Sequence, residues 1–217
     1  MSDVPALGFS TIDSSGEYAT KYSFFDTIQK HDPDIIIADG HGDPRTLTGQ
    51  GLQEILRSCT NNEILSGRFV CATSCLTGQI LGPDSRDKQA KAYTGWVNEF
   101  TWIVSPPYNP ATDPAAQSFE SIIRTLVTLM CRHQQGTISL RDVYDGTIAE
   151  FDRWEKYYSV PPGSEDPYAG DILISLRHDR NGLVTLGKEF YVGAPPISLK
   201  PLAPLAVGAL ALIWQFL

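Results

Sequence analysis

The sequence has few cysteines, no long basic run and no secretory leader. Its first residues, MSDVPALGFSTIDSSGEY, contain neither a basic segment nor an apolar core, so they do not match a secretory signal. Four scattered cysteines among 217 residues do not suggest a disulfide framework, which favours a reducing, cytoplasmic setting with free thiols. The net charge of −8 argues against binding nucleic acid, or an anionic membrane through charge alone.

Motifs for nucleotide and metal binding are also missing. The chain has neither a Walker motif nor a G-x-G-x-x-G sequence, so nucleotide binding has little support. Residues 39–43 (DGHGD) offer metal donors of the kind found in phosphoesterases, but a metal site would need further His or Asp clusters on other strands. No such cluster is evident, so we expect no cofactor, and a metal-dependent hydrolase is the weaker alternative.

The composition is that of an ordinary globular protein, with 42% hydrophobic and 19% charged residues. A chain of this length can form one sizeable α/β domain with a full core, which we expect over residues 1–198. Residues 199–217 are expected to be an apolar tail, because 202–217 are apolar except for Gln215. That run falls short of the roughly 20 residues that span a bilayer, so it suits a membrane anchor or a docking helix.

Hydrophobic periodicity and turn residues predict alternating helices and strands. Helices are expected at about 16–30, 50–58, 113–133 and 140–158, with a short one after residue 75. Strands are expected at 35–38, 68–74 and 92–96, and 82–87 should be a polar surface loop. Segments 172–176 and 183–186, joined by an Asn-Gly turn, should form a C-terminal β-hairpin. The pattern predicts a three-layer α/β fold with a mainly parallel sheet flanked by helices.

Two of the expected strands are each followed at once by a reactive residue beside glycine. His41 follows the run IIIADG, and Cys75 follows FVCATS. In an open parallel sheet, ligands bind beyond the carboxyl ends of the strands, so both side chains should project from one edge. Their separation of 34 positions leaves room for one crossover helix, as a βαβ unit needs.

A thiol would become more reactive if it lay close to the histidine. A histidine makes a thiol a good nucleophile by taking its proton, and a helix beginning after Cys75 would favour the thiolate further. Gly40 and Gly42 would let a peptide approach the backbone closely. The amide N–H groups of Gly42 and Cys75 could then form an oxyanion hole.

These motifs resemble the caspase-like superfamily of cysteine peptidases, which includes caspases, gingipains and CHAT domains. The resemblance rests on IIIADGHG, FVCATSCLTG and AKAYTGW, and extends over about residues 34–187. It implies a three-layer caspase-like fold, a His41–Cys75 dyad, backbone donors at Gly42 and Cys75, and peptide hydrolysis through a thioester. The interval between His41 and Cys75 is short for the group.

Substrates and partners are less constrained by the sequence. We expect a protein or peptide substrate, with an activator or a larger complex as a further partner and membrane association through residues 202–217. Four acidic residues could form a specificity loop for a basic side chain, although each is also typical of a solvated loop: Asp39, Asp43, Asp84 and Asp87. A caspase-like fold retained as a catalytically silent scaffold stays open as the alternative to a peptidase.

Overall fold

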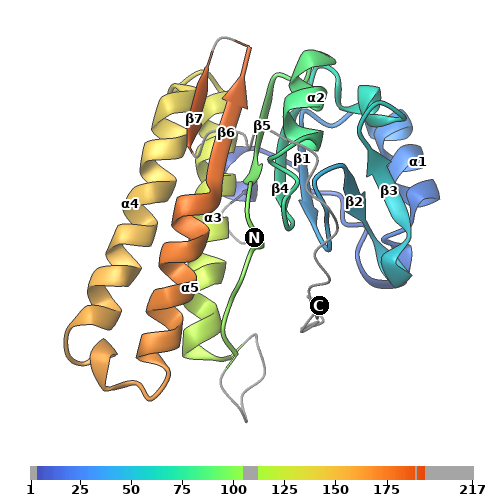
Figure 1. Cartoon of the computed structure of the whole chain (residues 1–217). Helices are drawn as coiled ribbons and strands as arrows, with labels where there is room; N and C mark the ends of the chain where they lie inside the picture. The colour runs from blue at the N-terminus through green and yellow to red at the C-terminus, as the bar shows by residue number, and fades with distance from the viewer. Residues whose placement is uncertain (1–3, 105–111, 189, 194–217) are drawn as a thin grey trace.

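The structure is a computed structural model in which residues 4–104, 112–188 and 190–193 are described. A five-stranded sheet forms its centre, in the order β1-β4-β5-β6-β7, beside a small two-stranded sheet of β2 and β3 (Figure 1). The strands are β1 Ile35–Asp39, β2 Thr46–Thr48, β3 Glu54–Arg57, β4 Phe69–Thr73, β5 Ala92–Trp96, β6 Leu183–Gly187 and β7 Tyr191–Gly193. The α-helices are α1 Lys21–His31, α2 Leu81–Asp87, α3 Pro114–Gln134, α4 Leu140–Ser159 and α5 Ala169–Gly182.

Helices cover both faces of the central sheet, which gives the expected three layers. Alternate residues of each strand point to opposite faces. Phe69 and Cys71 of β4 pack into a core cluster with α3, α4 and α5. Val70 and Ala72 pack into a second cluster with α1 and α2. The predicted α/β layering is therefore confirmed.

The sheet is parallel on one side and antiparallel on the other. β1 pairs with β4, and β4 with β5, in parallel. β6 pairs antiparallel with β5 and with β7. The predicted parallel arrangement thus holds for the three strands that carry the site, while the C-terminal strands extend the sheet in the other sense.

The connection from β1 to β4 differs from the prediction. Residues 50–58 are not a helix: Gln50–Leu52 form one 3₁₀ turn, and Glu54–Arg57 form β3, which pairs with β2. Ile55 and Leu56 are both buried, so their apolar character reflects a covered hairpin rather than one face of a helix. The crossover is therefore built from a two-stranded sheet.

The predicted C-terminal hairpin is only half right. Residues 172–176 belong to helix α5 rather than to a strand, and Asn181-Gly182 end that helix. The buried positions Ala169, Ile172, Leu176 and Asp179 follow the three-and-four spacing of a helix. The hairpin that does form pairs β6 with β7.

The segment after Cys75 also differs from the prediction. Residues 75–80 are turns, and the helix α2 begins only at Leu81. Residues 82–87 are consequently helical instead of a polar loop. Within the described residues, no helix has the length and apolarity needed to cross a membrane. The apolar run 202–217 lies outside the described residues.

Candidate active site

Backbone hydrogen bonds tie the residues after β1 to β4 and to β2, and the chain bends at Gly40. The carbonyl of Asp34 accepts from Phe69 N at 2.9 Å, and Gly40 N donates to Thr73 O at 3.4 Å. The even-numbered residues of this segment therefore direct their backbone groups toward β4. The carbonyl of His41 points the other way and accepts from Thr48 N at 2.9 Å.

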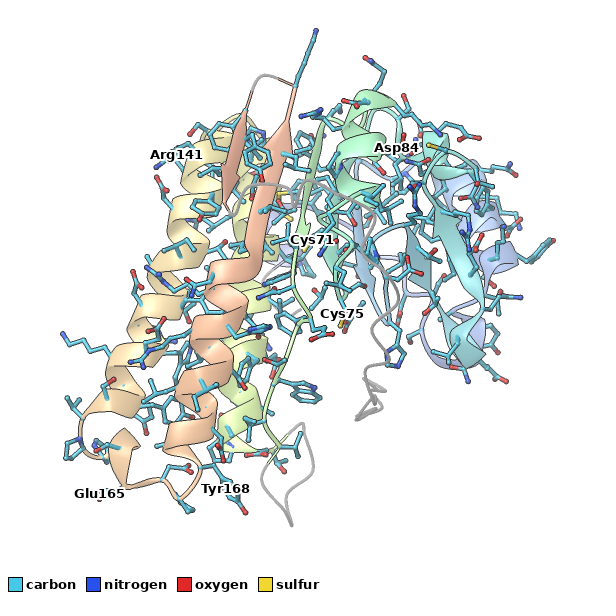
Figure 2. All side chains as sticks on the ribbon, in the orientation of Figure 1. Cys71, Cys75, Asp84, Arg141, Glu165 and Tyr168 are labelled. Atoms are coloured by element: carbon cyan, nitrogen blue, oxygen red, sulfur yellow. The ribbon has the colours of Figure 1, made fainter. Side chains whose placement is uncertain are left out.

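The strand register places the carboxyl ends of β1 and β4, which lead to His41 and Cys75, side by side. Asp39 is the partner of Thr73 across β1 and β4. Beyond this pair both chains bend, at Gly40 and at Ser74, and Gly42 lies against the carbonyl of Cys75. His41 and Cys75 both follow the carboxyl edge of the parallel strands, where ligands bind in open α/β sheets. In Figure 2 Cys75 lies beyond the end of β4, past the buried Cys71.

Gly42 allows the two loops to touch. A Cβ atom at Gly42 would lie 2.7 Å from the carbonyl oxygen of Cys75 and 2.7 Å from Cγ2 of Thr77, closer than real Cβ atoms come. Among the contacts of the described residues, neither Gly42 N–H nor Cys75 N–H donates to a backbone or side-chain acceptor outside its own residue. These two amides therefore meet the first requirement of an oxyanion hole.

Cys75 rests as a protonated thiol. It is half-buried, and burial raises the pKa of its thiol, with Glu99 and Asp179 adding to the rise. Its Sγ lies 4.0 Å from the carbonyl of Phe100. Because α2 begins at Leu81, no helix N-terminus counteracts this rise. Within the described part of the chain, no side-chain hydrogen bond joins His41 to Cys75 or to another residue, so the resting pair is disengaged.

A buried carboxyl, that of Asp179, lies beside Cys75. Asp179 and Thr101, which bonds to it, form what we call the wall. The side chain of Asp179 is fully buried near the end of α5, and desolvation holds its pKa well above the usual range. Its Oδ1 accepts from Thr101 N at 2.9 Å and Thr101 Oγ1 at 3.2 Å, while Oδ2 has no partner. The indole of Trp96 donates to its carbonyl at 2.9 Å. These bonds fix the segment after β5 next to Cys75.

Sequence reasoning missed this wall. It placed Asp179 in a hairpin turn, and it assigned no role to residues 99–101. The helical spacing of buried residues along α5 is the one signal that could have placed Asp179 correctly. The approach of Phe100 and Glu99 to Cys75 depends on tertiary packing and leaves no local pattern.

The four acidic residues expected in a specificity loop separate into two pairs. Asp39 and Asp43 flank His41; the carboxylate of Asp43 accepts from Arg45 N at 2.7 Å. Asp84 and Asp87 lie on α2, which leads back toward the start of β5. Asp84 accepts from Cys59 N at 2.7 Å and lies well above Cys75 in Figure 2. The first pair therefore lies beside His41, and the second pair does not.

Comparison with known proteins gives no relative. The chain matches no family model, no curated protein and no solved structure. Its function is therefore inferred from His41, Cys75 and their neighbours.

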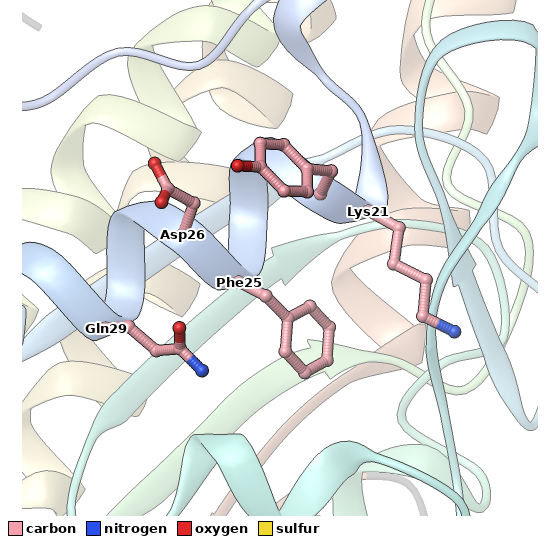
Figure 3. Close-up of a pocket in the computed structure, with 5 residues that line it drawn as sticks. Lys21, Phe25, Asp26 and Gln29 are labelled. Atoms are coloured by element: carbon pink, nitrogen blue, oxygen red, sulfur yellow. The ribbon is translucent and has the colours of Figure 1, made fainter.

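Other candidate sites in the described residues are weaker. A shallow hollow of about 310 Å³ lies on α1, lined by Lys21, Tyr22, Phe25, Asp26 and Gln29, and contains neither dyad residue (Figure 3). Over residues 4–104, 112–188 and 190–193, no group of three or more His, Cys, Asp or Glu side chains is arranged to hold a metal ion. The carboxyl edge of β1 and β4 is thus the site with the most chemistry.

Proposed function

We propose that the chain is a caspase-like cysteine endopeptidase in which His41 is the general base and Cys75 the nucleophile. The observation that carries the proposal is the parallel pairing of β1 with β4 up to Asp39 and Thr73, because His41 and Cys75 then follow neighbouring strands at one edge of the sheet. The order of the motifs, with histidine and then cysteine on neighbouring parallel strands, supports the caspase-like assignment.

The reaction follows from these positions. His41 takes the proton of Cys75 Sγ, and the thiolate attacks the carbonyl carbon of the peptide bond. The N–H groups of Gly42 and Cys75 stabilise the negative charge that forms on the oxygen. When the C–N bond breaks, His41 gives its proton to the leaving amine, and a thioester remains on Cys75. A water molecule, deprotonated by His41, then hydrolyses the thioester and restores the thiol.

Backbone strain beside the nucleophile supports the same assignment. Leu76 has a φ of 63°, a left-handed conformation that is rare for a bulky residue. Its N–H donates to the carbonyl of Asn98 at 2.9 Å, which ties the turn to the segment after β5. Strained residues of this kind concentrate at active sites, where the surrounding structure holds them. The turn presents Cys75 in front of the sheet edge.

A binding module without catalysis is the second candidate. The observation that favours it is the resting state of the pair, in which Cys75 is protonated and His41 has no side-chain partner among the described residues. A substrate or an activator would have to bring the imidazole onto the thiol. In a scaffold the imidazole would never reach the thiol, so the presence or absence of peptide cleavage distinguishes the two candidates.

The test is cleavage of a mixed peptide library, read by mass spectrometry. We expect the wild-type protein to cleave a subset of peptides, and Cys75→Ala and His41→Ala to remove the cleavage while leaving the thermal unfolding curve in place. Cys59→Ala is the matched control, because Cys59 is the exposed thiol of the described chain and lies against Asp84. Cleavage that survives Cys75→Ala would refute the mechanism. A well-folded wild-type protein that cleaves nothing would favour the binding module.

A further inference from the structure

Three exposed apolar side chains gather where the start of α1 meets the turn between β2 and β3. Tyr22, Leu52 and Tyr18 are 80%, 66% and 65% exposed, which makes them three of the four most exposed large apolar side chains of the described residues. The segment Gly16–Tyr18 lies against Gln50–Leu52, and Tyr22 follows in the first turn of α1. A single exposed apolar residue needs no explanation, whereas several at one place indicate a binding surface.

Hydrogen bonds hold the turn and the start of α1 together. Gln50 N donates to Ala19 O at 2.8 Å, and Lys21 N donates to Gln53 Oε1 at 3.1 Å. The two segments approach so closely that a Cβ atom at Gly49 would collide with Ala19 O. The exposed apolar side chains therefore stand on one joined unit.

Leu52 keeps an unfavourable backbone conformation without burying its side chain. Its φ of 60° lies in the left-handed region, which is rare for a bulky residue, and it follows Gly51 at a φ of 62°. Glycine or asparagine would adopt this conformation more readily. Burial does not compensate for the strain, because the residue is largely exposed. Strain retained at an exposed apolar residue indicates that the side chain has a binding role.

The same turn is tied to the candidate active site. Thr48 donates to the carbonyl of His41 from its N–H at 2.9 Å and from its hydroxyl at 3.0 Å. Leu52 follows Thr48 by four residues, so their Cα atoms are at most roughly 14 Å apart. An extended peptide advances about 3.3 Å per residue. A peptide held at Cys75 could therefore reach Leu52 with a residue about four to six positions from the cleaved bond.

The hollow on α1 continues this surface (Figure 3). Its lining includes Tyr22 and Phe25 beside Lys21, whose N–H is bonded to the turn. Asp26 also lines the hollow, but its carboxylate is paired with Lys30 at 2.8 Å, and Lys21 forms no ion pair within the described residues. The hollow thus offers aromatic rings and one unneutralised cation, which suits an apolar side chain next to an acidic one.

We propose that Tyr18, Leu52 and the hollow on α1 form an exosite, a surface outside the dyad that binds an apolar side chain of the peptide substrate. The inference rests on the proposed function of His41 and Cys75. An acidic residue next to the bound side chain adds to the affinity through Lys21. Because the exosite holds the substrate equally before and during the reaction, it lowers KM and leaves kcat unchanged.

The first test aligns the cleavage sites of a mixed peptide library. We expect apolar residues to be enriched about four to six positions from the cleaved bond. Leu52→Asn should remove that enrichment and raise KM roughly tenfold with kcat unchanged, because a buried leucine contributes about that much to binding. The variant should unfold at the same or a higher temperature, since asparagine tolerates the left-handed conformation. A structural role for Leu52 would lower that temperature instead.

Two further variants complete this test. Tyr18→Ser removes the second side chain of the exosite without touching the strained turn, and it should weaken the apolar preference as well. Ile174→Asn is the matched control, because it removes a side chain that is 68% exposed on α5, and it should leave both KM and the preference unchanged. A preference that survives in both Leu52→Asn and Tyr18→Ser, or cleavage with no apolar preference at all, would overturn the exosite.

Direct binding separates this inference from the proposed function. The probe is a fluorescein-labelled decapeptide with one phenylalanine–glutamate pair, compared with the same peptide carrying two serines and read by anisotropy in the Cys75→Ala background. Tighter binding of the first peptide, lost in Leu52→Asn, would keep the exosite even if the wild-type chain cleaves nothing and the peptidase is rejected. Equal binding of the two peptides would overturn the exosite. Binding that appears only in a chain ending at residue 198 would show that the tail occupies the surface, and would overturn the assignment to substrate.

Discussion

At the scale of single residues, the surroundings of Gly42 and Asp179 are the most informative about the site. Gly42 is needed because its backbone lies against that of Cys75, with no room for a side chain. Burial of Asp179 lowers the stability of the folded state, because a buried carboxyl with an unpaired oxygen loses its hydration without full compensation. A costly group retained beside the candidate nucleophile suggests a role in shaping that wall rather than in stabilising the fold.

Replacing Gly42 with alanine should disable the site with a modest loss of stability. The new Cβ must push against Cys75 O, which displaces the amide donor by enough to cost up to about 100–1000-fold in kcat. The overpacking should lower the free energy of unfolding by about 1–3 kcal/mol. Peptide cleavage and urea unfolding check both numbers. Gly170→Ala is the control, because a Cβ there meets nothing within 4 Å; equal activity in the two variants would contradict the account.

Replacing Asp179 with asparagine should stabilise the protein at high pH. Because the folded carboxyl has a raised pKa, the folded state loses stability as pH rises from about 4, the unfolded value, through the folded pKa. Asparagine keeps an acceptor for Thr101 and cannot ionise. Its unfolding midpoint should exceed that of wild type at pH 8 but not at pH 4, by about 2–4 °C for each kcal/mol. Asp171→Asn, an exposed change at the start of the same helix, should show no such pH dependence; a gain equal at both pH values would contradict the prediction.

At the scale of elements, local sequence patterns predicted correctly those helices and strands whose formation depends on the local sequence. The strands β1, β4 and β5 are short apolar runs buried in a parallel sheet, and the sequence shows them directly. The helices α3 and α4 carry broad apolar faces, and Ser139 caps α4. The sequence also shows that His41 and Cys75 each follow one of these strands, while the dyad itself stays a prediction.

The errors lie where tertiary contacts overrode local pattern. Residues 172–176 are apolar except for Ser175 and so resemble a strand, yet α5 exposes Ile174 and buries Leu176. Residues 54–57 pair with β2, a contact with no local signature. The wall formed by Asp179 and Thr101 joins two residues that are 78 positions apart in the sequence. Pairings of this kind cannot be read from a single sequence.

Removing the cap of α4 should cost stability without affecting chemistry. Ser139 Oγ accepts from Asp142 N while Ser139 N donates to the Asp142 carboxylate. Ser139→Ala leaves the first turn with an unsatisfied donor, and the loss should be about 1 kcal/mol in the free energy of unfolding. Ser159→Ala, at the other end of the helix, removes only a bond to the Glu155 carbonyl and should cost less than about 0.5 kcal/mol. Similar losses in chemical denaturation would show that the capping box contributes nothing.

At the scale of the whole molecule, charge and the apolar tail suggest where the protein acts. We propose that any membrane association uses the apolar residues 202–217, since a net charge of −8 gives no electrostatic attraction to an anionic surface. The full chain should float with neutral lipid vesicles, and a chain ending at residue 198 should not, while both unfold at the same temperature. If the shortened chain unfolds early instead, the tail packs on the domain and the membrane proposal fails.

The central claim is that His41 and Cys75 act as one unit on a peptide. Its most direct test is covalent labelling with peptide-based, cysteine-directed probes, with the labelled residue identified by mass spectrometry. The account predicts labelling of Cys75, none in Cys75→Ala, and a rate at least about 100-fold lower in His41→Ala, because a positioned general base is worth that much or more. Labelling of Cys75 at the same rate without His41, or of Cys59 in its place, would contradict the account.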